Sequence, residues 1–72
     1  MTRLFLAGNY EQAFDAARDL PPGSWRYIGE RRDLLGRRDG SFVVVGTFWK
    51  RRDARELYDT ARAQGLTEEE RP

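Results

Sequence analysis

The run Phe42–Val45 constrains the fold of this 72-residue chain more than any other feature. It places four large apolar residues in succession, three of them β-branched, with no polar residue between them. Successive side chains of a strand point to opposite faces, so this pattern is typical of a strand buried on both faces. Central strands of parallel sheets have that environment, because helices cover both faces of such sheets. The run therefore predicts an α/β fold.

Two further strands are expected on either side of a helix. Leu4–Ala7 is a short apolar run that ends at the turn signal Gly8-Asn9, and it predicts a buried strand. Ser24–Gly29 predicts a second strand, in which Arg26 alternates with aromatic residues. This alternation favours a half-exposed strand or one at the edge of the sheet.

Two helices are predicted from apolar residues at three- and four-residue spacing. Asn9 is placed to cap the first helix, which Pro21-Pro22-Gly23 ends. Its expected apolar face consists of Tyr10, Ala13, Phe14, Ala17 and Leu20. The second helix spans Asp53–Gln64 and ends at Gly65, and its expected buried stripe consists of Ala54, Leu57, Tyr58 and Ala61. Glu30–Leu35 is compatible with one helical turn or a loop, and Gly36–Ser41 is expected to be a turn.

The expected architecture is a single α/β domain over residues 1–66, followed by a disordered acidic tail over residues 67–72. The domain is a minimal, mainly parallel, three-stranded sheet in the order β-α-β-β-α. It corresponds to half of a Rossmann-like or flavodoxin-like sheet. The first crossover is expected to be parallel, whereas the direction of the third strand stays open.

Composition excludes several functions. The chain has no Cys and no His, so disulfides, imidazole metal sites and a conventional catalytic triad are excluded. We therefore expect no enzyme, no cofactor and no metal. A domain this small has a marginal core, which favours a homo-oligomer. The chain contains neither a signal peptide nor a membrane-spanning run, so we expect a cytoplasmic protein without a membrane partner.

One ligand site is predicted where two strands end. Parallel strands present their carboxyl ends at one edge, and ligands of open parallel sheets bind there. Each of the two corners, Gly8-Asn9-Tyr10 and Gly46-Thr47-Phe48, has a glycine followed by a polar and an aromatic residue. A nucleotide or another phosphate-bearing ligand would suit such a pocket. The candidate ligand-binding residues are Gly8, Asn9, Tyr10, Gly46, Thr47, Trp49, Arg51 and Arg52. The alternative is that these residues only form turns, cap a helix and cover the core.

A basic block raises the question of nucleic acid. Residues 26–55 contain nine of the Lys and Arg residues against four Asp and Glu, although the whole chain has a net charge of +1. Its arginines and lysine would contact phosphates, and Trp25, Tyr27 or Trp49 would stack on bases. The sequence pI of about 8.2 is below the range above about 9 that is typical of dedicated binders. Nucleic acid therefore ranks third among the expected ligands.

Five short motifs carry a resemblance to small accessory proteins of actinobacterial phages. They are Leu6–Asn9, Trp25–Ile28, Asp33–Gly36, Val43–Thr47 and Arg51–Asp53. The resemblance implies a compact α/β accessory protein that works in the host cytoplasm, and it transfers no catalytic residue. Together with the residue analysis it favours a non-enzymatic protein that binds itself or a host protein. Small-ligand binding at the strand ends is the first alternative.

Overall fold

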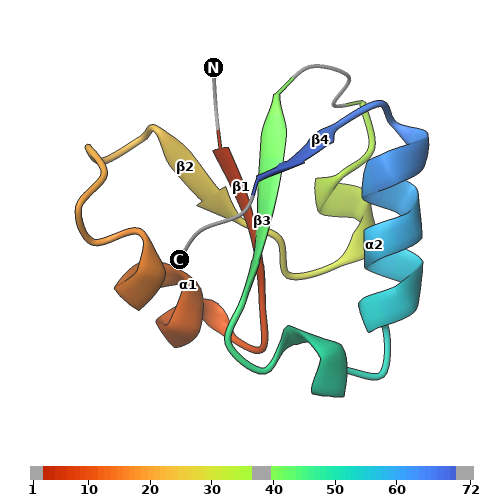
Figure 1. The fold of residues 1–72 in the computed structure, drawn as a ribbon, viewed down its shortest axis with the longest axis horizontal. Helices are drawn as coiled ribbons and strands as arrows, with labels where there is room; N and C mark the ends of the chain where they lie inside the picture. Colours follow the sequence, from red (N-terminus) through yellow and green to blue (C-terminus); the bar gives the residue numbers. More distant parts are fainter. Residues whose placement is uncertain (1–2, 37–39, 70–72) are drawn as a thin grey trace.

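The computed structural model describes residues 3–36 and 40–69 of the chain. Their strands are β1 (Arg3–Ala7), β2 (Trp25–Tyr27), β3 (Ser41–Val45) and β4 (Thr67–Glu69), and their α-helices are α1 (Tyr10–Ala16) and α2 (Ala54–Ala63). Two short 3₁₀ helices, η1 (Arg31–Asp33) and η2 (Phe48–Lys50), precede β3 and α2. The four strands form one parallel sheet in the order β2-β1-β3-β4 (Figure 1).

The two central strands divide the core between the faces of the sheet. Leu4 and Leu6 of β1 pack in one cluster with Phe42 of β3 and with the apolar stripe of α2. Phe5 and Ala7, which alternate with them, pack in a second cluster with residues of α1. Side chains of neighbouring residues in a strand point to opposite faces, so α1 and α2 cover opposite faces of the sheet. The fold is a small three-layer α/β/α domain.

The structure confirms the mixed α/β fold and the central position of Phe42–Val45. β3 lies between β1 and β4 and runs parallel to both, which answers the open question of its direction. β2 lies at one edge of the sheet, as the alternation around Arg26 predicts. Asn9 caps α1 as expected, because its side chain accepts a hydrogen bond from the amide of Gln12.

Two predictions about the sheet were wrong: the number of strands and the disorder of residues 67–69. These residues form β4, and the amide of Thr67 donates to the carbonyl of Gly40. Their charges find partners, since Glu69 pairs with Arg3 at 2.7 Å and Glu68 accepts a hydrogen bond from Tyr58. That hydrogen bond raises the pKa of the Tyr58 hydroxyl above its ordinary value. Charged residues are tolerated here because an edge strand leaves their side chains partly in water. The rest of the predicted tail, residues 70–72, lies outside the described residues.

Helix α1 is shorter than predicted. It ends at Ala16, and residues 17–20 continue as a turn in which the amide of Leu20 donates to the carbonyl of Ala17. Pro21 keeps Leu20 out of a helix, because the residue before a proline disfavours the helical conformation. The predicted turn at Gly36–Ser41 falls partly outside the described residues, at positions 37–39. No helix in the described ranges is long and apolar enough to cross a membrane.

Candidate functional site

The two predicted corners meet at the carboxyl edge of the central strands. Ala7 and Val45 are register partners in β1 and β3, so Gly8 and Gly46 follow two adjacent strand ends. The geometric condition for one shared ligand site is therefore fulfilled. The side chain of Gln12, however, already lies between the two corners. Its Oε1 accepts hydrogen bonds from the amides of Gly8 and Thr47 at 2.9 and 3.0 Å.

Sequence reasoning missed the role of Gln12. An anionic ligand at this edge would use the same two amides, which the glutamine carbonyl oxygen now satisfies. Its amide nitrogen also donates to Oγ1 of Thr47 at 3.1 Å. The available signal was its position three residues after the capping Asn9, which places it in the first turn of α1. Such a position directs a side chain back toward the start of its helix.

Both corner glycines lie against the Gln12 side chain. A Cβ atom on Gly46 would overlap Oε1 of Gln12, and Gly46 also has a φ of +61°. We expect Gly46→Val to lower the free energy of unfolding by about 2 kcal/mol, because a branched residue is strained in this conformation and displaces Gln12. Urea denaturation measures this effect. An unchanged unfolding midpoint would show that Gln12 is not held between the strand ends.

Arg51 also has a different role from the one expected. Its guanidinium donates to the carbonyl oxygens of Ala7, Ile28 and Gly29 at 3.0, 3.3 and 2.6 Å. It also forms a bidentate pair with Asp53, at 2.9 and 3.0 Å. The Arg51 side chain is only 15% exposed. These contacts tie the ends of β1 and β2 to the start of α2, so its donors are engaged within the protein.

The remaining predicted ligand residues do not converge. Asn9 is engaged in the helix cap, and Arg52 is exposed. Trp49 packs its ring against Phe48 and Tyr58, with ring centroids 5.1 Å apart in both cases. Tyr10 lies against the aromatic residues of β2 instead of facing the strand ends.

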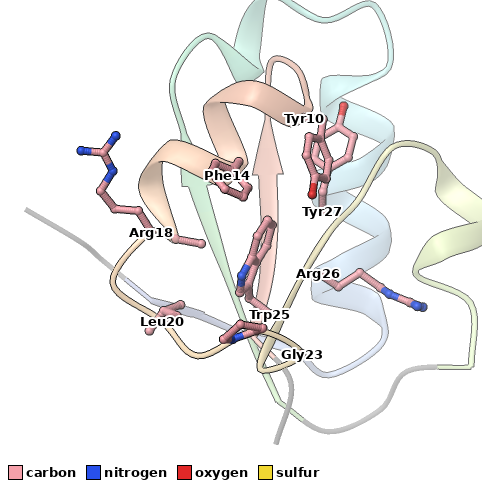
Figure 2. A pocket seen from close by; sticks show the side chains of 10 residues that line it. Tyr10, Phe14, Arg18, Leu20, Gly23, Trp25, Arg26 and Tyr27 are labelled. Carbon is pink, nitrogen blue, oxygen red and sulfur yellow. The ribbon is translucent and has the colours of Figure 1, made fainter.

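An aromatic groove lies between α1 and β2 (Figure 2). Its volume is about 630 Å³, within the range of about 300–1,000 Å³ typical of ligand pockets. Tyr10 and Phe14 come from α1, and Trp25 and Tyr27 come from β2. The ring of Tyr10 lies 6.1 Å from that of Trp25 and 5.8 Å from that of Tyr27, while Phe14 lies 6.2 Å from Trp25.

Two of these rings are more exposed than a core position allows. Tyr10 and Phe14 are 57% and 55% exposed, although the helical spacing predicts that they face the core with Ala13 and Ala17. The two alanines take the buried positions, and the short α1 leaves the larger rings over the groove. The ring of Trp25 packs edge to face against the buried ring of Phe5, with the ring centroids 5.7 Å apart. The groove is thus an aromatic surface in which the rings pack against one another and remain open to solvent.

Three arginines in the described part of the basic block are engaged with carboxylates. Arg31 pairs with Glu56 and Arg32 pairs with Glu30, whereas Arg51 is internal. Arg37 and Arg38 lie outside the described residues. Within the described ranges, no group of three or more Asp and Glu residues is arranged to hold a metal ion.

Comparisons with protein-family models, with curated proteins and with solved structures gave no match to this chain.

Proposed function

We propose that this protein is a non-enzymatic binding module that holds another polypeptide in the groove between α1 and β2. The observation that carries the proposal is the exposure of Tyr10 and Phe14 beside the half-buried Trp25 and Tyr27. Aromatic residues are enriched at the centres of protein interfaces, where they bury large areas at a small entropic cost. If the protein is a phage accessory factor, as the resemblance implies, its partner is a host protein.

A selection from a random nine-residue peptide library, with this protein immobilised, tests the proposal. We expect enriched peptides whose binding is weakened at least about tenfold by Phe14→Ser, since truncating an interface hot spot costs about 2 kcal/mol. The matched control is Leu35→Ser, because Leu35 is also 55% exposed but does not line the groove. The absence of enriched peptides, or equal weakening by both variants, would contradict the proposal.

Self-association is a second kind of binding, and it need not use the groove. The small core and the edge strand β4 support it, since strand edges readily add another strand. We expect light scattering at about 100 μM protein to give a mass above that of the 8.4 kDa monomer. A clean monomer would contradict the expected homo-oligomer and leave binding to a different protein.

A small ligand at the ends of β1 and β3 is the second candidate function. The strand order 2-1-3-4 supports it, because it matches the first four positions of the flavodoxin-like order. In that order ligands bind at the switch point between β1 and β3. Gln12→Ala should expose the amides of Gly8 and Thr47, so we expect inorganic phosphate to bind this variant more tightly than the parent. Equal phosphate titrations would remove this candidate.

We propose that nucleic acid is at most a weak ligand. The pairing of Arg31, Arg32 and Arg51 with carboxylates supports this, because paired guanidiniums contribute little to phosphate binding. We expect no sub-micromolar binding to DNA or RNA at about 150 mM salt. Tight binding that Arg52→Ala abolishes would reverse this ranking.

A further inference from the structure

The outer edge of β2 runs along the aromatic groove. The amide of Arg3 donates to the carbonyl of Ser24, and the amide of Ile28 donates to the carbonyl of Phe5. Even-numbered residues of this segment therefore direct their backbone groups toward β1. Because the direction alternates along a strand, the amides and carbonyls of Trp25 and Tyr27 point away from the sheet.

The side chains of β2 are divided between two faces. Trp25 and Tyr27 pack with the α1 cluster and line the groove, whereas Arg26 lies between them in sequence and points away from their rings (Figure 2). Arg26 is exposed, and no carboxylate in the described part of the chain pairs with it. Two arginines line the groove: Arg18 pairs with Asp15 at 3.0 Å, so among the described residues Arg26 is the lining charge without an ion-pair partner.

We propose that the partner of the groove is an extended acidic segment of a different protein, which adds to the sheet as a strand beside β2. This inference rests on the proposed function and names the chemistry of its partner. The outward-pointing backbone groups of Trp25 and Tyr27 pair with the added strand. Its apolar side chains, two residues apart, contact the aromatic groove, and the Asp or Glu between them lies opposite Arg26.

Pairing of β2 with a second copy of itself is less favourable for a physical reason. The antiparallel register in which all three residues of β2 find partners places Arg26 directly opposite Arg26 of the other copy. Like charges directly opposite each other destabilise a strand pair. A carboxylate at that position replaces the repulsion by an attraction. The single charged residue of β2 therefore selects a partner other than β2 itself.

Peptide selections against the wild type and against Arg26→Glu test the charge of the partner. We expect Asp or Glu between alternating apolar residues for the wild type, and Lys or Arg at the same position for Arg26→Glu. For one peptide, exchanging Glu for Lys should weaken binding to the wild type about tenfold. The matched control is Arg52→Glu, which makes the same charge change at an exposed residue that does not line the groove and should keep the acidic preference.

Hydrogen exchange with an enriched peptide tests the strand geometry. We expect the amides of Trp25 and Tyr27 to become protected when the peptide binds, because they then donate to its backbone. Groove-dependent peptides without an acidic preference, or without this protection, would overturn the inference and leave the proposed function in place. An oligomer that Phe14→Ser dissociates would also overturn it, by making a second copy the occupant. If no peptide depends on the groove, the proposed function itself fails.

Discussion

Replacing Arg51 by methionine should lower the free energy of unfolding by about 3 kcal/mol. Methionine keeps much of the aliphatic volume but donates no hydrogen bond. The carbonyl oxygens of Ala7, Ile28 and Gly29 would lose their guanidinium donor, and the carboxylate of Asp53 would lose its bidentate partner. For a domain of this size, the loss corresponds to a fall of about 15 °C in melting temperature.

The matched control for this change is Arg52→Met, which removes the same charge from an exposed neighbour. We expect it to change stability by less than about 0.5 kcal/mol. Urea denaturation of the two variants under identical conditions measures the difference. Equal stabilities would mean that Arg51 does not tie the strand ends together, and would return it to the set of residues available to a ligand.

Ending the chain after Leu66 should destabilise the domain by about 2 kcal/mol. This change removes β4, and with it the ladder to β3 and the ion pair between Glu69 and Arg3. It also turns β3 from a central strand into an edge strand, which exposes part of the buried Phe42 side chain to solvent. Each lost backbone hydrogen bond contributes about 0.5–1.5 kcal/mol, and the newly exposed apolar area adds to that.

A double substitution distinguishes the contribution of the β4 backbone to stability from the contribution of its charged side chains. Glu68→Gln with Glu69→Gln keeps the backbone ladder of β4 and removes only partly exposed charges, so we expect a loss of less than about 1 kcal/mol. Circular dichroism during thermal unfolding compares both variants with the parent. A truncated chain as stable as the parent would contradict the pairing of β4 and agree with the disorder predicted for these residues.

The central fold could be predicted because its signals are local. Phe42–Val45 has the composition of a doubly covered strand, and the spacing of Ala54, Leu57 and Ala61 matches the period of a helix. β4 could not be predicted in the same way. Its three residues, Thr67–Glu69, are polar, and they form a strand because Arg3, Ser41 and Tyr58 are brought beside them by the fold.

The candidate site could be predicted only in position. Two glycine corners after parallel strands correctly indicate one shared edge. Whether that edge is open depends on Gln12 and Arg51, because each reaches from its own corner to the end of the other strand. Likewise, the spacing of Tyr10 and Phe14 predicts a buried face, but whether a ring is buried depends on how much of the sheet a seven-residue helix covers.

A map of amide chemical shifts in ¹⁵N-labelled protein, recorded while an enriched peptide is added, shows directly where the peptide binds. We expect the shifts to change at Trp25–Tyr27 and along α1, on the groove side of the sheet. Changes confined to Gly8 and to residues 46–52 would contradict this expectation, because they would place binding at the carboxyl ends of β1 and β3.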